Sequence, residues 1–211
     1  MTETKRPPTP RELVADGVVH ALGVGLGLPA AIVLVAWTAF RHGHQLAPIA
    51  IYAAGLCAMF VCSAAYNVLR RSRLRGWLRR FDHAAIFAMI GGTYTPFTVL
   101  RLESVWSAVL TGVIWSVAGL GIVAKLLQPR WIEPVSVGLY LALGWIGVVA
   151  IGPFLDGLAT TTLALLAAGG VVYTAGVAFF LWQRLPYHNA IWHAFVLVAA
   201  GLHYGAVVTM V

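Results

Sequence analysis

Apolar residues fill long runs along this chain, and short polar segments separate each run from the next. A transmembrane helix needs roughly 20 predominantly apolar residues, and seven runs are long enough. They cover residues 17–40, 46–69, 82–100, 105–127, 132–154, 157–182 and 189–211. The pattern therefore predicts an all-α integral membrane bundle of seven transmembrane helices over residues 17–211, with a polar segment over residues 1–16 before it.

The composition favours the same class of protein. Of the 211 residues, 60% are hydrophobic and only 10% are charged, whereas soluble domains average about 25% charged residues. The formal net charge of +7 could suggest a nucleic-acid partner. However, the basic residues lie between the apolar runs, so we expect anionic lipid headgroups and no nucleic acid as their partners.

The basic residues also predict an orientation, because the side of a membrane protein that is rich in Lys and Arg is cytoplasmic. With seven crossings, the other side carries only Arg41 and Arg101. The N-terminal side carries twelve basic residues: Lys5, Arg6, Arg11, Arg70, Arg71, Arg73, Arg75, Arg79, Arg80, Lys125, Arg130 and Arg184. We therefore expect a multi-pass protein of the cell (inner) membrane, with a cytoplasmic N-terminus and the C-terminus outside.

The loop from Arg70 to Arg80 has a helical pattern of its own. Its arginines alternate with apolar residues at helical spacing, namely Leu74, Trp77, Leu78 and Phe81. This pattern is typical of a short helix that lies in the headgroup region. Two interpretations remain open: a basic anchor that fixes the topology, or a surface that senses anionic lipids. Lys125 and Glu133 flank the fourth and fifth runs, where long side chains can snorkel to the interface.

Polar residues inside the apolar runs gather at one end of the predicted bundle. They belong to the first, second, third and last runs: Glu12, Asp16, His20, Ser63, Asn67, Asp82, His83, His188, Asn189 and His193. His203 lies deeper in the last run. Polar groups in lipid pair with one another, so a structural hydrogen-bond network is one interpretation. The other is a pocket, for which Asp82 is the first candidate because a carboxylate at the bilayer edge needs a partner, water, a metal or a proton.

Two sequence blocks carry a resemblance to a known family. The first is DHAAIFAMIGGTYTPF from Asp82 to Phe97, and the second is AIWHAFV beginning at Ala190. With the Glu12, Asp16, His20 spacing and the segment SAAYN that ends at Asn67, they resemble the hemolysin III branch of the progestin and adipoQ receptor superfamily. The resemblance covers nearly the whole chain and implies the same seven-helix plan.

The resemblance implies a zinc site at the cytoplasmic end, which this chain matches only in part. The family's three histidine ligands correspond to Asn67, Asn189 and His193, and the nearby aspartate corresponds to Asp82. Asp16 stands where the family usually has Asn. Zinc favours imidazole, thiolate and carboxylate ligands, and an amide oxygen is a weaker donor. We therefore expect a degenerate zinc site with low occupancy.

The functional expectation is a hemolysin III-type membrane protein with a polar pocket, whose role by resemblance is in membrane homeostasis or cytolysis. Enzymatic activity stays open. The alternative is a zinc-dependent, ceramidase-like lipid amide hydrolase, in which Asp82 would orient the attacking water or accept its proton. A third interpretation is a receptor-like module that binds a lipid ligand inside the bundle.

Overall fold

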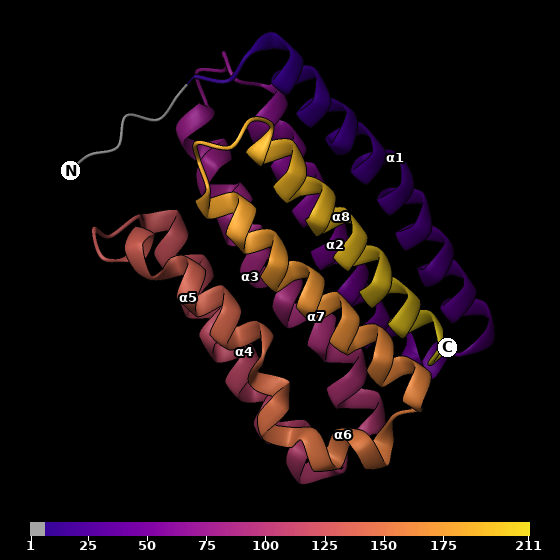
Figure 1. Ribbon diagram of the computed structural model, residues 1–211. Coiled ribbons are helices and arrows are strands. Elements are labelled where there is room, and N and C mark those ends of the chain that lie inside the picture. The colour runs from indigo at the N-terminus through magenta and orange to yellow at the C-terminus, as the bar shows by residue number, and fades with distance from the viewer. Residues whose placement is uncertain (1–6) are drawn as a thin grey trace.

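The computed structural model describes residues 7–211, and these residues form helices with no strand among them (Figure 1). The helices are α1 (Pro10–Arg41), α2 (Leu46–Val68), α3 (Arg75–Arg101), α4 (Ser104–Leu127), α5 (Ile132–Gly144), α6 (Ile151–Gly157), α7 (Thr160–Leu181) and α8 (His188–Val208), with short 3-10 helices η1 (Gly43–Gln45) and η2 (Ile146–Ala150). The bounds of α2, α4, α7 and α8 agree with the predicted runs to within three residues.

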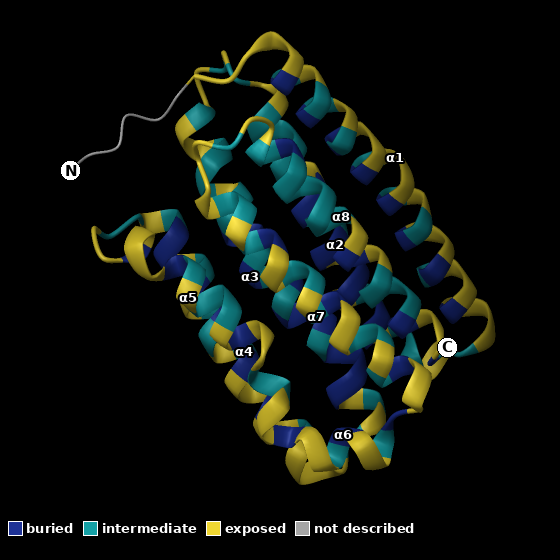
Figure 2. Cartoon of the chain, viewed as in Figure 1, coloured by how far each residue is buried: buried dark blue, intermediate teal, exposed yellow. Residues whose placement is uncertain are grey.

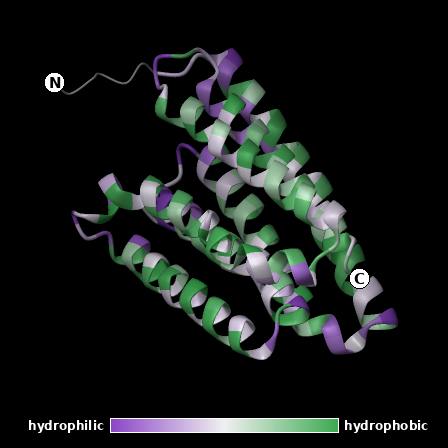
Figure 3. Ribbon diagram, turned by 60° about the horizontal axis from the view of Figure 1, so that its bottom comes forward, coloured by the Kyte–Doolittle hydropathy of each residue, from purple (hydrophilic) through white to green (hydrophobic). Residues whose placement is uncertain are grey.

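Six segments of this described part are long and apolar enough to cross a membrane: α1, η1 with α2, α4, α5 through α6, α7 and α8. Large apolar side chains lie exposed along them, as in Leu26, Ile32 and Val109. Figure 3 shows hydrophobic ribbon along the middles of the helices and hydrophilic ribbon at many of their ends. Because lipid solvates such surfaces, the chain is a multi-pass, all-helical membrane protein.

The helices pack mostly with their neighbours in the chain. α2 lies between α1 and α3, α4 packs on the other side of α3, and α8 joins α1 to α7. α5 contacts α3 and α4 and touches α7 only slightly. Buried residues face the inside of this arrangement (Figure 2). The first described residues and Val211 lie at opposite ends of the bundle (Figure 1).

α1 begins at Pro10, seven residues before the predicted start at residue 17. Thr9 and Glu12 form a capping box, in which the Thr9 N–H donates to Glu12 Oε2 at 2.7 Å and the Glu12 N–H donates to Thr9 Oγ1 at 3.3 Å. Residues 10–16 therefore belong to the first helix. The predicted start was late because the polar residues Glu12 and Asp16 face other helices, where hydropathy alone does not place them.

Small residues let α1 approach α2 closely. A Cβ at Gly27 would overlap the ring of Phe60, and one at Gly23 would meet the same ring at 3.0 Å. Small residues at helix interfaces have this effect in membrane proteins generally. The close approach brings the inner face of α1, which includes Asp16 and His20, against the end of α2.

The predicted short helix in the headgroup region is wrong. α3 begins at Arg75 and runs without a break to Arg101, so Trp77 and Phe81 lie on its first turns. The Arg80 guanidinium donates to the carbonyl of Leu126 at 3.0 Å and stacks over Trp77, which ties this extension to the end of α4. The helical spacing was correct, but spacing does not tell whether a helix bends at the membrane surface.

The predicted fifth helix, residues 132–154, is interrupted after Gly144 and continues as η2 and α6. The Tyr94 hydroxyl lies in the break: it donates to the Gly144 carbonyl at 2.6 Å and accepts from the Gly147 N–H at 3.0 Å. A side chain inserted into the helical hydrogen-bond ladder is a common cause of such a break. Two glycines lower the local helix propensity further.

Candidate functional site

The predicted site residues gather at the end of the bundle where α1, α3 and α8 begin and α2 ends. A cavity of about 830 Å³ opens among these helices. Its lining includes nearly all of the predicted residues: Glu12, His20, Ser63, Asn67, Asp82, His83, His188, Asn189, His193 and His203. Asp16 lies just behind this lining and is only 2% exposed. Beyond its polar end the cavity continues between apolar residues such as Met89, Leu166 and Val196.

A buried carboxylate forms the centre of the polar end. Asp16 Oδ1 is hydrogen-bonded to His193 Nδ1 at 2.6 Å and lies 3.7 Å from His20 Nε2. The two imidazole rings lie 4.3 Å apart, centroid to centroid. Asp16 Oδ2 lies 3.6 Å from a guanidinium nitrogen of Arg70. We call Asp16, His20 and His193 the α1–α8 cluster.

The sequence explains how these three side chains meet. Asp16 and His20 are one helical turn apart on the inner face of α1, together with Glu12 one turn earlier. His193 lies on the second turn of α8, and α8 packs directly on α1. Potential ligand atoms of the three residues lie within 4.8 Å of one another.

Glu12 has a separate role. Its Oε2 closes the capping box with Thr9, and its Oε1 accepts the backbone N–H of Tyr187 at 2.9 Å. Tyr187 has a left-handed backbone (φ 61°) at the start of α8, and its own side chain caps no backbone group. Glu12 therefore acts as a cap for α8 from another helix, and a carboxylate there also suits the positive end of the helix dipole.

Asp82 lies beside the α1–α8 cluster and is not part of it. Its carboxylate interacts with the Ser63 side chain and with the charges of His193, Asp16 and Arg79. It is half-buried and lines the cavity. The sequence thus placed Asp82 at the correct end, whereas the geometry puts Asp16 at the centre of the buried polar groups.

A second charged cluster, which the sequence did not predict, lies between α3, α4 and α5. Glu133 Oε2 pairs with Arg79 at 3.1 Å, and Glu133 Oε1 lies 3.4 Å from Lys125 Nζ. His83 joins this group, with Nδ1 3.9 Å from Glu133 Oε1. We call Arg79, His83, Lys125 and Glu133 the α3–α5 cluster. The expectation that Lys125 snorkels to the interface is wrong, since its side chain is 1% exposed.

His83 and His203 therefore belong to other parts of the cavity. His83 follows Asp82 directly, and successive helical residues point about 100° apart, which turns the two side chains toward different clusters. His203 lies deeper, where its Nε2 is 3.3 Å from the Leu166 carbonyl and its ring packs against Tyr173. Neither histidine belongs to the potential metal-binding group of the described residues.

The residues that correspond to the family's zinc ligands fit the metal poorly. The Asn67 Nδ2 group donates to the Ser63 carbonyl of its own helix at 3.0 Å. Asn189 offers a second neutral amide on the first turn of α8. Amide oxygens are weak zinc ligands, so of this set only the imidazole of His193 suits the ion.

Comparison with known proteins places the chain among relatives of similar length. The sequence model of the family described as "Haemolysin-III related" matches residues 11–204. Hemolysin-3 of Bacillus cereus is 34% identical over 189 residues, which cover 89% of this chain and 86% of that protein. The Hemolysin-3 homolog of Bacillus subtilis is 31% identical over 190 residues, or 90% of this chain and 89% of that protein.

A more distant similarity reaches animal proteins. The monocyte to macrophage differentiation factor of Homo sapiens is 31% identical over 163 residues, which cover 74% of this chain and 67% of that protein. The family match spans both clusters and every residue of the cavity lining from Glu12 to His203.

Proposed function

Because this chain belongs to the haemolysin-III related family, we propose that it binds a lipid-like amphiphile in a pocket between its transmembrane helices. The cavity carries this proposal: about 830 Å³, polar at one end and apolar along the rest. Ligand pockets are commonly about 300–1,000 Å³, mostly apolar, with a few converging polar groups. The headgroup would lie near the two clusters and the chain along α3, α7 and α8. Such binding would serve membrane homeostasis or the cytolysis that the relatives' names suggest.

The experiment compares two matched variants on α8. Val196 lines the cavity, whereas Val198 is 56% exposed on the outer surface. Val196→Trp should fill the apolar part of the cavity and reduce the lipid that co-purifies, as measured by mass spectrometry of extracts. Val198→Trp should retain as much as wild type. Equal retention by both variants, or a wild type without tightly held lipid, would contradict the proposal.

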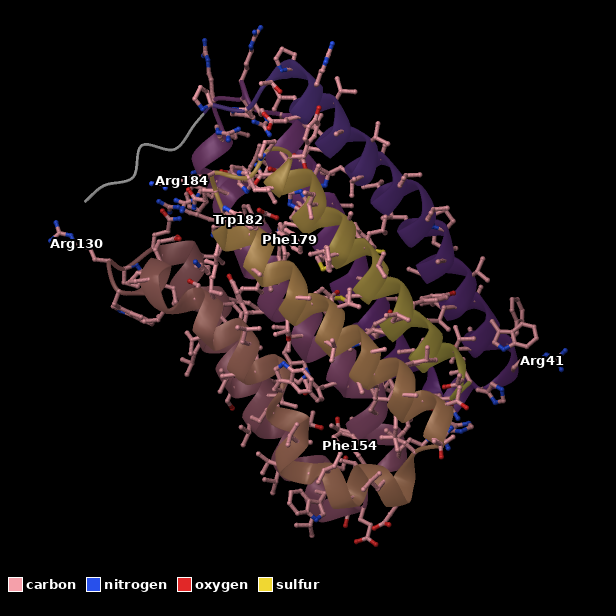
Figure 4. All side chains as sticks on the ribbon, in the orientation of Figure 1. Arg41, Arg130, Phe154, Phe179, Trp182 and Arg184 are labelled. Atoms are coloured by element: carbon pink, nitrogen blue, oxygen red, sulfur yellow. The ribbon has the colours of Figure 1, made fainter. Side chains whose placement is uncertain are left out.

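The topology proposed with this function has seven crossings: the six apolar segments described above and, in addition, α3. α3 has 27 residues, enough to cross a bilayer, although its first turns carry arginines. The basic side chains support a cytoplasmic polar end: Arg130 and Arg184 lie at the end where α1 begins, and Arg41 at the other (Figure 4). Lys5 and Arg6 lie outside the described residues. A periplasm-active reporter fused after Val211 should be active, and one inserted beside Arg73 silent; the reverse would reject this orientation.

Anionic headgroups are the proposed neighbours of the loop between α2 and α3. Arg70 and Arg75 in this region bind protein groups: Arg70 lies beside Asp16, and Arg75 stacks over Tyr66. Arg71 and Arg73 are exposed. These two are therefore the arginines that would meet lipid phosphates, each worth about 1 kcal/mol near an anionic surface.

A second candidate function is hydrolysis of a lipid amide, and the α1–α8 cluster beside Asp82 is the observation that favours it. A zinc ion in the pocket would supply a polarised water molecule. Asp16, His20 and His193 would hold the ion, and the Asp82 carboxylate would orient water or accept its proton. Proteoliposomes supplied with a ceramide should then release fatty acid, and Asp82→Asn should stop the release. Absence of turnover by metal-loaded wild type would reject this candidate.

A further inference from the structure

We propose that this chain can hold a divalent transition-metal ion, of which zinc fits best, on Asp16, His20 and His193 between α1 and α8. This site differs from the set that the family resemblance implies, because two residues of α1, Asp16 and His20, replace Asn67 of α2 and Asn189 of α8. The inference deepens the proposed function, on which it rests only in that the metal site lies at the polar end of the same pocket.

The chemistry of the three side chains suits zinc. They offer one carboxylate and two imidazoles, and zinc sites in proteins often combine three such ligands with water in the fourth position. Their potential ligand atoms lie within 4.8 Å of one another, so a single ion could reach all three. Asp16 is 2% and His20 6% exposed, so these two side chains are shielded from water, unlike carboxylates on a protein surface.

One atom in the cluster independently indicates a missing ligand. His20 Nε2 is buried and has no hydrogen-bond partner among the described residues. It faces Asp16 Oδ1 at 3.7 Å, which is too long for a hydrogen bond. A buried polar atom without a partner costs about 1–3 kcal/mol. A metal ion between the imidazole and the carboxylate would satisfy this nitrogen.

A hydrogen bond between Asp16 and His193 occupies the place that the metal ion would take. The carboxylate oxygen of Asp16 and the Nδ1 atom of His193 lie 2.6 Å apart, with the proton of a hydrogen bond between them. Metal ions bind deprotonated ligands and release protons when they do so. The ion would therefore take the place of this proton, and the two ligand atoms would move apart to bind it.

Arg70 is the competing cation. One of its terminal nitrogens lies 3.6 Å from Asp16 Oδ2, and its Nε donates to the Asn67 carbonyl at 2.9 Å. The guanidinium thus approaches the carboxylate oxygen that faces away from His193. Removal of this charge should strengthen binding of a divalent cation, because a positive neighbour repels it.

The test measures metal binding by the full chain in detergent, without reference to turnover or to lipid. Protein stripped with a chelator is titrated with zinc against a chromogenic competitor, and bound zinc is counted by mass spectrometry. We expect about one zinc per wild-type chain. His20→Gln and Asp16→Asn should each weaken zinc binding at least about tenfold, and Arg70→Gln should strengthen it. His203→Gln, which changes a histidine of the same cavity outside the cluster, should bind like wild type.

Two further measurements keep the result clear if a variant folds badly. Cobalt(II) added to wild type should give the intense visible bands of a four-coordinate site, and zinc should raise the wild-type unfolding temperature because it binds the folded state. Wild type that binds no zinc, or that binds it equally well without His20, overturns the inference. Lipid retention measured on the same samples reports separately on the proposed function.

Discussion

The two charged clusters lie at the same end of the bundle and line the same cavity, yet they are built in opposite ways. In the α1–α8 cluster the carboxylate is the buried partner: the side chain of Asp16 is 3% exposed and that of Arg70 28% exposed. In the α3–α5 cluster the cation is buried: Lys125 is 1% exposed and Glu133 is 39% exposed. Two basic side chains, Lys125 and Arg79, share that one acid.

This difference supports the proposal that the α1–α8 cluster, and not the α3–α5 cluster, binds a metal cation. Around Asp16 one permanent cation, the Arg70 guanidinium at 3.6 Å, stands beside two imidazoles, His193 at 2.6 Å and His20 at 3.7 Å, which provide lone pairs and carry a full charge only when protonated. Around Glu133 the neighbours are two basic side chains, Arg79 at 3.1 Å and Lys125 at 3.4 Å, for one acid. A count of charged residues would treat the two clusters alike; the burial of each partner separates them.

The largest expected effect comes from removal of the buried acid. Asp16→Leu leaves Arg70 and the hydrogen-bonded His193 without their shared acceptor, and removal of one partner from a buried pair typically costs about 3–5 kcal/mol. Reversible unfolding in mixed micelles of increasing SDS content measures this loss. A variant as stable as wild type would mean that Asp16 is not a structural centre of the polar end.

An intermediate effect is expected for Glu133→Gln. Arg79 and Lys125 contact different oxygens of Glu133, and the amide keeps only one of these acceptors and no charge, so we expect a loss of about 1–2 kcal/mol. The same unfolding assay applies. If this conservative change destabilises the protein as much as Asp16→Leu does, the contrast between the clusters does not hold.

The smallest effect is expected for Lys125→Met. Methionine keeps most of the side-chain volume, and Glu133 retains Arg79 and contact with water. Because Glu133 is 39% exposed, the change leaves no buried charge without a partner, so stability should change by less than about 1 kcal/mol. Zinc affinity should not change. A large decrease in the free energy of unfolding would show that the buried lysine stabilises the bundle.

The sequence was sufficient to predict an all-helical membrane protein and the bounds of α2, α4, α7 and α8, and it grouped polar residues that the structure also brings to one end. The Asp16, His20 spacing set one face of α1, and alternate helix directions brought the starts of α1, α3 and α8 to one level. The sequence could not predict which of these polar side chains would bind to which. Glu12 and Asp16 look equivalent in the sequence, but the backbone N–H of Tyr187 uses Glu12 and leaves Asp16 to His193.

Other differences come from contacts between residues far apart in the chain. The break after Gly144 depends on the hydroxyl of Tyr94, 50 residues away, and no local pattern reveals it. Lys125 was expected at the interface because long basic side chains can usually reach water there. Its burial depends on how α5 packs beside α4 and brings Glu133 to it.

The cap that Glu12 provides for α8 also has a consequence for biosynthesis. α1 leaves the ribosome first and α8 last among the described helices, so the Glu12 carboxylate must wait for its Tyr187 partner while 174 residues are made between them. During that time Asp16 and His20 have no His193 beside them. The nascent chain therefore carries acidic groups on its first helix whose contacts are complete only when α8 arrives, and release of a stalled chain before α8 would leave an incomplete bundle for the cell's membrane proteases to recognise.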